Sequence, residues 1–284
     1  MRLVITGTTG RVGRALADRL AVFHEIVELP RTQLDLGADG CERVLETVDF
    51  DVLLNPAGLT SLEQCEDHPQ LAYRVNADAP GRLAKSCHGR PVLHFSTDYV
   101  FDGSTPGLRH ENEPPSPLSV YGKTKAAGEV GVLAAGGTVM RVSWVFGPEK
   151  PAFPDQIVAK ALAGQELAAV ADKDSLACFT PDLCEWVNGW LAAGCPGGIF
   201  HGCQSGEPVS WHGMALDIVA LLAEKGIPVT GVKALSMAEM TAFRAPRPRH
   251  TAMATDRLTD LLGKAPRDWR TALREHVEAL LISR

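Results

Sequence analysis

Short apolar runs alternate with longer amphipathic segments through the first half of the chain. Five nearly continuous apolar runs indicate strands, at 2–6, 25–29, 51–55, 91–96 and 138–143. Apolar residues at helical spacing fill the intervals, at 10–20, 42–48, 69–88 and 120–135. Strands that are apolar throughout and alternate with helices are typical of a parallel sheet covered on both faces, with right-handed crossovers. The pattern predicts an α/β fold with a doubly wound parallel sheet.

The alternation loosens after about residue 147. Helical spacing continues at 154–164, 180–194, 211–226 and 268–283, and short strands are indicated at 198–203 and 228–235. The closing helix carries its apolar residues on one face, at Trp269, Leu273, Val277, Leu280 and Leu281. We therefore predict a sheet domain over 1–150 and a smaller region over 151–284, some of whose elements return to the main sheet.

Composition and charge narrow the function classes. Charged residues make up 22% of the 284, and the formal net charge is −6 without any block of basic residues, which argues against nucleic-acid binding. No apolar run approaches the roughly 18–20 residues of a membrane helix. The chain is predicted to enter a strand at Arg2, so we expect no signal peptide. We expect a cytoplasmic protein with neither a nucleic-acid nor a membrane partner.

The cysteines argue against a covalent or metal framework. There are seven, an odd number, and no two form a C-x-x-C pair, so we expect neither a disulfide scaffold nor a structural zinc site. Reduced, buried thiols are the expected state. No acidic cluster requires a divalent ion either, and we predict no metal.

A glycine-rich loop follows the first predicted strand and opens the first predicted helix. In "TGTTGRVG", Gly7, Gly10 and Gly13 are spaced G-x-x-G-x-x-G, with Thr9, Arg11 and Val12 between them. The first glycine would permit a tight turn, the second would let backbone approach a pyrophosphate, and the third would allow close helix–sheet packing. The phosphates would lie at the positive end of the helix. The alternative is a glycine-rich turn without a ligand, but this context favours a Rossmann-type, NAD(P)-binding domain over 1–150.

The stretch "YGKTK" places Tyr121 and Lys125 one helical turn apart. A nearby ammonium lowers the pKa of a phenol, and a phenol poised in this way exchanges a proton with a carbonyl or alcohol. Ser96 and Thr97 end the fourth strand and offer a hydroxyl to polarise a substrate oxygen, since ligands of open α/β sheets bind beyond the strand ends. A chance helical pair and a helix N-cap are the alternatives. Together and in this order, these residues favour a catalytic constellation.

The same strings resemble a known family. The G-x-x-G-x-x-G and Y-x-x-x-K patterns are those of extended short-chain dehydrogenase/reductases. "STDYVFDG", "PLSVYGKTKAAGE", "RVSWVFGP" and "RPRHTAMATDRL" resemble, in order, strings of the dTDP-4-dehydrorhamnose reductase family. "DKDSLACFTPDLCEWV" is similar to a further segment of that family, so the resemblance spans nearly the whole chain.

The resemblance implies a fold, a reaction and residue roles. It implies NAD(P)H-dependent reduction of the 4-keto group of a dTDP-6-deoxyhexulose. Thr97, Tyr121 and Lys125 would be catalytic, with Lys125 also on the nicotinamide ribose. Further cofactor contacts would come from Asp35, Leu36, Asn55, Ala57, Gly58 and Thr60, and sugar contacts from Asp98, Tyr99 and Trp144. Asn76 falls where related enzymes keep a structural or proton-relay asparagine. A homodimer is left open.

Some positions depart from the family pattern, so the identity of the substrate sugar stays open. Pro56 replaces a small residue, Ala177–Cys178–Phe179 replaces a Gly-x-Pro turn, and Thr251 and Met253 replace Ser and Leu. Two other functions stay open: a non-catalytic nucleotide-binding subunit of the kind that partners methionine adenosyltransferase, and another nucleotide-sugar epimerase, dehydratase or reductase. In "RPRH", Arg247 has a planar guanidinium that suits a diphosphate, so we predict that it contacts the nucleotide sugar. The alternative is a solvated run of charged residues.

The end of the second strand bears on the choice of cofactor. An acidic residue there would favour NADH, by binding the ribose 2′-hydroxyl. Instead the strand runs into Pro30 and Arg31, and we expect Arg31 to have no acidic partner within its turn. Arg11 and Arg14 are expected to add positive charge on the same side. A guanidinium suits a 2′-phosphate, so we predict NADPH, with NADH as the alternative.

Overall fold

A six-stranded parallel sheet forms the centre of the protein. The computed structural model describes residues 1–229 and 231–282, and its main sheet has the order β10-β5-β4-β3-β1-β2. The strands are β1 (Arg2–Thr6), β2 (Glu25–Leu29), β3 (Val52–Asn55), β4 (Val92–Thr97), β5 (Thr138–Val142) and β10 (Gly198–Gly202). The predicted α/β class is confirmed, and these six strands match their predicted bounds to within one residue. The direction of chain progression reverses between β1 and β3, which is where ligands bind in such sheets.

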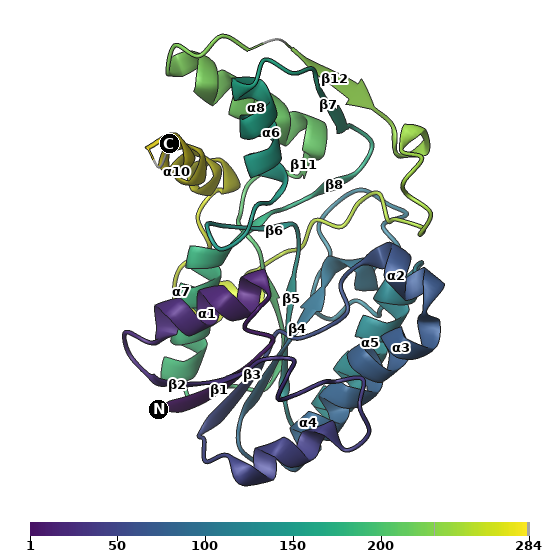
Figure 1. Cartoon of the computed structure of the whole chain (residues 1–284), viewed down its shortest axis with the longest axis vertical. Coiled ribbons are helices and arrows are strands. Elements are labelled where there is room, and N and C mark those ends of the chain that lie inside the picture. The colour runs from purple at the N-terminus through teal and green to yellow at the C-terminus, as the bar shows by residue number, and fades with distance from the viewer. Residues whose placement is uncertain (230, 283–284) are drawn as a thin grey trace.

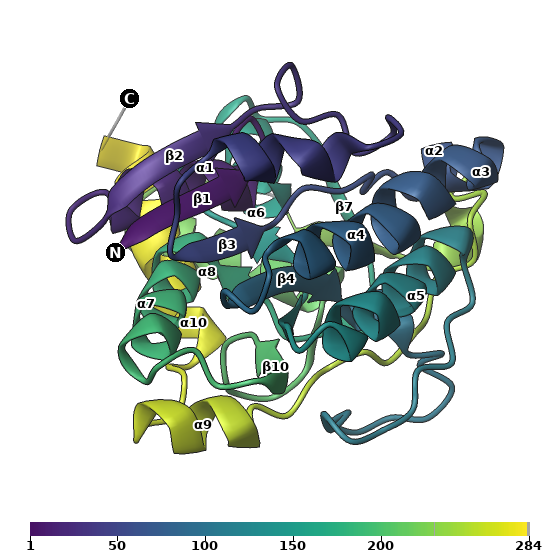
Figure 2. The ribbon, with the colours of Figure 1, turned by 90° about the horizontal axis from the view of Figure 1, so that it is seen from below.

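Helices cover both faces of this sheet, as Figures 1 and 2 show. They are α1 (Arg11–Leu20) and α7 (Thr180–Ala192) on one face, and α4 (Ala79–Ser86) and α5 (Val120–Ala134) on the other. Successive residues of a strand point to opposite faces. Leu3 and Ile5 of β1 therefore pack toward α1, whereas Val4 packs toward α4. All three side chains are fully buried, which explains why the strands are apolar without interruption.

Several elements differ from their predicted form. The helix predicted over 69–88 is three segments: α3 (Pro69–Tyr73), a π-helical stretch η2 (Arg74–Asp78), and α4. The helix predicted over 42–48 is the 3-10 helix η1 (Cys41–Thr47). Several short elements were not predicted, among them α2 (Leu62–Asp67), α9 (Asp256–Leu262) and β7 (Leu167–Val170). Each spans at most about two periods of its apolar spacing, too few for the pattern to be distinguished from that of a loop.

A second unit sits beyond the carboxyl ends of the strands, at the top of Figure 1. It contains α6 (Phe153–Leu162), α8 (Trp211–Glu224), α10 (Trp269–Ile282) and β12 (Val232–Leu235), which pairs with β7. These elements share one apolar core. The strand predicted at 228–235 includes Thr230, and the helix predicted over 268–283 includes Ser283; both residues lie outside the described part of the chain.

Two small strand pairs and two longer elements tie the units together. β6 (Val145–Phe146) pairs with β9 (Cys178–Phe179), and β8 (Asp174–Ser175) pairs with β11 (Val209–Ser210). β10 and α7 come from the second half of the chain but belong to the main sheet and its helical cover. Among the described residues, no helix has the length and apolar character needed to cross a membrane.

Candidate active site

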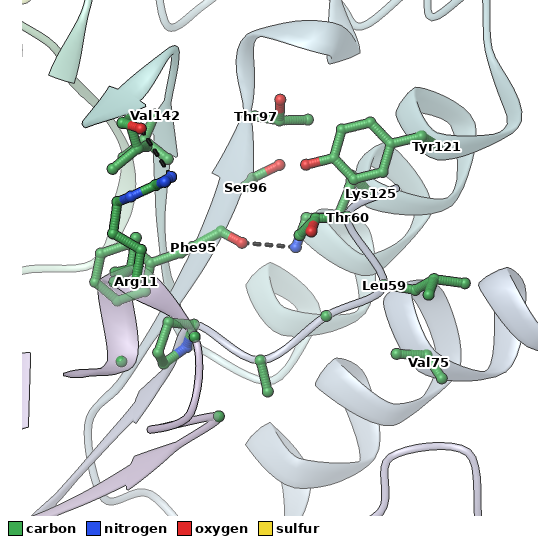
Figure 3. Close-up of a pocket in the computed structure, with 18 of the residues that line it drawn as sticks. Arg11, Leu59, Thr60, Val75, Phe95, Ser96, Thr97, Tyr121, Lys125 and Val142 are labelled. Atoms are coloured by element: carbon green, nitrogen blue, oxygen red, sulfur yellow. Dashed lines mark hydrogen bonds between the residues drawn. The ribbon is translucent and has the colours of Figure 1, made fainter. Parts of the chain in front are cut away.

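A cleft of about 760 Å³ lies at the carboxyl ends of the central strands. Figure 3 shows part of its lining. Most residues predicted to form the site line it: Gly7, Thr9, Gly10, Arg11, Val12, Gly13, Arg31, Asp35, Leu36, Ala57, Gly58, Thr60, Thr97, Asp98, Tyr99, Tyr121, Lys125 and Trp144. Two predicted residues, Asn55 and Arg247, do not. Segments far apart in the sequence thus meet in one cavity.

The glycine loop has the backbone geometry expected of it. Gly7 has a φ of 58°, in the left-handed region that favours glycine. A Cβ on Gly13 would lie 2.3 Å from the Gly7 carbonyl oxygen, so helix α1 could not approach the loop with any other residue there. Gly10 is the N-cap of α1 and gives it no side-chain cap. The first N–H groups of α1 therefore have no capping side chain and open toward the cleft, which suits a diphosphate.

The loop after β3 is fixed by Asn76. Its Oδ1 accepts a hydrogen bond from the Leu59 backbone N–H at 2.8 Å, and its Nδ2 donates to the Leu59 carbonyl at 2.9 Å and to Thr124 at 3.2 Å. Asn76 is fully buried in the π-helical stretch. Of the two roles that its position suggested, structural or proton-relay, these bonds support the structural one.

The three predicted catalytic residues converge on the cleft. Thr97 ends β4, where its Oγ1 donates to Asp98 Oδ1 at 3.1 Å and accepts from the Tyr99 N–H at 3.2 Å. Ser119 caps α5 and so fixes the first turn, which carries Tyr121. In Figure 3 the Tyr121 hydroxyl points toward the Ser96 hydroxyl, with Thr97 beside them.

The electrostatics of Tyr121 differ from the prediction. Burial raises the pKa of Tyr121 above its usual value, and a hydrogen bond with Thr97 offsets part of that rise. We predicted that Lys125 would lower this pKa, but its ammonium is directed elsewhere. Lys125 Nζ lies 2.6 Å from the Phe95 carbonyl oxygen and 3.1 Å from His94 Nε2. Burial lowers the pKa of Lys125 itself to about 8. The prediction of a lowered Tyr121 pKa is therefore wrong for this arrangement.

A buried polar cluster lies behind Asp98, at the end of the cleft near the second unit. Thr251 Oγ1 donates to Asp98 Oδ2 at 2.5 Å, and Ser175 Oγ lies 3.4 Å from the same oxygen. Lys173 Nζ donates to the Pro248 carbonyl at 2.9 Å and is fully buried. Burial raises the pKa of Asp98, and the positive charge of Lys173 opposes this. Thr251, which departs from the family's Ser, keeps a hydroxyl that bonds this carboxyl.

Aromatic residues form the wall between the two units. The rings of Tyr99 and Tyr121 meet edge to face, 5.9 Å between centroids. Trp144 has a φ of 43°, an unusual value for a bulky residue, and its ring lies 5.4 Å from that of Trp211 in α8. Lys173 Nζ lies 4.8 Å from the centre of the Tyr99 ring. These contacts connect the wall of the cleft to the second unit.

Two expectations about the cationic residues were wrong. Arg31 does have an acidic partner: its Nε lies 3.7 Å from Asp35 Oδ1, because the turn after Pro30 is helical and brings residues four apart together. Arg14 adds no free charge, because it pairs with Glu28 at 3.0 Å and Asp18 at 2.7 Å. Arg11 donates to backbone carbonyls of residues 145, 150 and 151 and still lines the cleft.

The two predicted residues that do not line the cleft lie next to it. Arg247 Nη2 pairs with Glu63 Oε1 of α2 at 2.9 Å, and its guanidinium stacks 3.7 Å from the centre of the Phe243 ring. The Asn55 side chain is buried beneath the loop after β3 and bonds Thr6 and His94. Their predicted ligand contacts stay predictions.

Sequence reasoning missed other residues of the lining. They are mainly apolar or small side chains: Leu34, Pro56, Leu59, Leu62, Gln64, Leu71, Val75, Phe95, Val142, Ser143, Val145 and Lys150. An apolar residue on a helix gives no sign of whether it faces a core or a ligand. Ser96, which the sequence offered beside Thr97 as a source of the polarising hydroxyl, also lines the cleft, and within the described part of the chain its buried Oγ has no hydrogen-bond partner. Among residues 1–229 and 231–282, no group of three or more His, Cys, Asp or Glu is placed to hold a metal ion.

Comparisons with known proteins agree with this geometry. Residues 1–282 match the family described as the RmlD substrate binding domain. The chain is 32% identical to a dTDP-4-dehydrorhamnose reductase of Burkholderia thailandensis, over 99% of each protein. It is 35% identical to a probable dTDP-4,6-dihydroxy-2-methyloxan-3-one 4-ketoreductase of Streptomyces antibioticus, over 97% of this chain and 94% of that protein.

Solved structures give the same result. A dTDP-4-dehydrorhamnose reductase of Clostridium acetobutylicum superposes with a TM-score of 0.89 at 28% identity, over 99% of this chain and 100% of that one. The corresponding enzyme of Bacillus anthracis, in complex with NADP, superposes with a TM-score of 0.87 at 25% identity, over 98% of this chain and 99% of that one. From the match over nearly its whole length, the chain belongs to the RmlD substrate binding domain family.

Proposed function

We propose that this protein is an NADPH-dependent reductase of the 4-keto group of a dTDP-6-deoxyhexulose, with dTDP-4-dehydro-L-rhamnose or a close analogue as substrate. The observation that carries the proposal is the meeting of Thr97, Tyr121 and Lys125 with the glycine loop in one cleft. The names of the relatives, all full-length matches, support the same reaction.

The residues present fit a nicotinamide dinucleotide. The loop Gly7–Gly13 and the open N-terminus of α1 would hold the diphosphate. Asp35, Leu36, Ala57, Gly58 and Thr60 line the same cleft and would contact the adenosine part of the cofactor. Lys125, on α5, would bind the nicotinamide ribose. When bound, the reduced nicotinamide supplies the hydride.

Tyr121 supplies the proton. Reduction adds hydride to the carbonyl carbon and a proton to the carbonyl oxygen, so the acid must be protonated when the substrate binds. The raised pKa of Tyr121 keeps the phenol in that form at neutral pH. Thr97 lies beside the phenol, and its hydroxyl is held by Asp98 and the Tyr99 N–H. Tyr121 thus donates to the oxygen that becomes the alcohol, and Thr97 can add a second hydrogen bond to it once its proton turns away from Asp98.

The sugar end of the cleft is formed by Asp98, Tyr99 and Trp144. Thr251 fixes one oxygen of Asp98, and Thr97 contacts the other. Arg247, which we propose for the diphosphate of the dTDP sugar, is held beside α2 by Glu63 and is 8% exposed. It would have to leave this pair to reach the ligand.

One assay tests the proposal. The protein is mixed with NADPH and dTDP-4-dehydro-L-rhamnose, and the absorbance of the reduced nicotinamide is followed, with NADPH binding measured separately by fluorescence. We expect the absorbance to fall and dTDP-L-rhamnose to form. NADPH binding without turnover of this or any other dTDP-4-keto sugar would contradict the proposal and favour a nucleotide-binding subunit. Interconversion of nucleotide sugars without net NADPH consumption would favour an epimerase.

A further inference from the structure

A buried histidine lies directly against Lys125. His94 is on β4, three residues before Thr97, and is fully buried. Its Nε2 lies 3.1 Å from Lys125 Nζ. Lys125 Nζ also donates to the Phe95 carbonyl oxygen at 2.6 Å. Figure 3 shows the lysine turned toward this carbonyl. The two contacts fix the position of the ammonium on the floor of the cleft.

The other side of the imidazole is held as well. Asn55 Nδ2 lies 3.1 Å from His94 Nδ1, and Asn55 Oδ1 accepts from Thr6 Oγ1 at 2.7 Å. Thr6 Oγ1 in turn accepts from the Ala57 N–H at 3.2 Å, in the loop after β3. The side chains of Thr6, Asn55 and His94 are each at most 1% exposed. A hydrogen-bonded chain therefore crosses three adjacent strands and ends on Lys125.

The chemistry of this chain restricts the tautomer of His94. An ammonium only donates, so His94 Nε2 accepts when Lys125 is charged, and the ring proton is then on Nδ1. That proton needs an acceptor, which the Asn55 amide provides by turning its oxygen toward the ring. Thr6 permits either amide orientation, because a hydroxyl both donates and accepts. When Lys125 is neutral, the orientation with Asn55 Nδ2 toward the ring leaves the proton on Nε2, where it points at the amine.

We propose that His94 is a positioning residue for Lys125: it accepts a hydrogen bond from the ammonium, and the Asn55–Thr6 pair orients its ring to do so. This inference rests on the proposed function, in which Lys125 binds the nicotinamide ribose and works beside Tyr121. The role matters because burial lowers the pKa of Lys125 to about 8, so the lysine is close to losing its charge at physiological pH. An acceptor for the ammonium retains that charge.

The other titratable groups that face Lys125 and His94 do not accept a hydrogen bond from the ammonium in place of His94. Glu129, one turn along α5, favours the ammonium, but both of its oxygens are bound by Arg141, at 2.9 and 2.7 Å. From α2, the Cys65 thiol faces Lys125; burial raises its pKa to about 11, so it is neutral. Tyr121, whose pKa burial raises, is also neutral. Burial and the Lys125 charge lower the pKa of His94 well below its usual value, so the ring is a neutral acceptor.

Three variants at position 94 test the inference. In His94→Gln the amide oxygen reaches the position of Nε2, whereas in His94→Asn it reaches only the position of Nδ1, and His94→Phe offers no acceptor. NADPH affinity and kcat/KM for reduction are measured from pH 6 to 10. Without the acceptor the charged lysine is less stable, so its pKa falls. As the pH rises and Lys125 loses its charge, both quantities should decline. We expect the midpoint pH of this decline to be lower by about one unit in His94→Asn and His94→Phe than in the wild type. His94→Gln should keep the wild-type midpoint pH.

The outcomes separate this inference from the proposed function. The NADPH-binding profile needs no sugar, so it tests His94 even if no dTDP sugar is reduced. Equal midpoints in the wild type, His94→Gln and His94→Asn would overturn the inference, as would a wild-type NADPH affinity that does not fall between pH 7 and 9. Thermal unfolding of each variant identifies any loss that comes from instability alone. If His94→Phe does not fold, the contrast between Gln and Asn carries the test.

Discussion

The ends of the cleft that we propose for the cofactor and for the sugar are built in different ways, and we call them the cofactor end and the sugar end. The cofactor end is made of backbone: a glycine loop, a helix N-terminus and a loop fixed by Asn76. The sugar end is made of side chains that meet from distant parts of the chain, such as Asp98 and Thr251, which are 153 residues apart. A site made of backbone depends on a short local sequence. A site made of distant side chains changes its specificity with single substitutions while the fold stays the same.

The largest expected effect comes from the residue between the two ends. Tyr121→Phe removes the proton donor and keeps the ring that packs on Tyr99, so we expect kcat to fall by about 10²–10⁴-fold. NADPH affinity and the affinity for the dTDP sugar should both stay within about threefold, because neither end of the cleft is altered. Steady-state kinetics and fluorescence titration give the two measurements. Turnover close to that of the wild type would remove Tyr121 from its role.

Gly13→Ala should damage only the cofactor end. The new Cβ would meet the Gly7 carbonyl at 2.3 Å and the Thr8 Cα at 2.9 Å, and these backbone atoms cannot move without shifting α1. Overpacking of this kind costs about 1–3 kcal/mol, so we expect NADPH affinity to fall by about ten- to a hundredfold. Gly197→Ala is the control, since a Cβ there meets nothing within 4 Å. An unchanged NADPH affinity in Gly13→Ala would mean that the loop does not hold the diphosphate.

Arg247→Ala should damage only the sugar end. If the guanidinium binds the dTDP diphosphate, we expect the KM for the sugar to rise by about tenfold, the size of one charge-assisted hydrogen bond, with NADPH affinity unchanged. Arg244→Ala is the matched control: Arg244 pairs with Asp67 on the same helix α2 but is 59% exposed. The same rise in KM in both variants would point to a loosened α2 rather than to a lost ligand contact.

Arg31→Ala should have the smallest effect, on the choice between cofactors. Arg31 is 77% exposed and lies 3.7 Å from Asp35, so solvent and a carboxylate both weaken its attraction for a 2′-phosphate. We expect NADPH affinity to fall by less than about tenfold and NADH affinity to stay the same. Titration of each variant with both cofactors measures this. A wild type that prefers NADH, or equal losses for both cofactors, would show that Arg31 does not contact the phosphate.

The contrast between a site made of local backbone and a site made of distant side chains also explains which features the sequence predicted. The parallel sheet and the glycine loop follow from local periodicity and spacing, and most residues carried over from the family resemblance do line the cleft. The ion pair between Arg31 and Asp35 was missed because it depends on a helical turn after Pro30. The contact between His94 and Lys125 joins two elements and leaves no trace in the spacing of either one. Buried polar partners of this kind become visible only when the strands are side by side.

The return of β10 to the main sheet has a consequence for synthesis of the chain. Strands β1 to β5 leave the ribosome long before β10, so the outer edge of β5 has no neighbouring strand until residue 202 has been made. Helix α7, which covers α1 and part of one sheet face, is also made late. Open edges of this kind pair readily with other chains. A fragment that ends near residue 150 would therefore expose both an unpaired strand edge and an uncovered apolar face. Residues 180–202 thus protect the first half of the chain from aggregation.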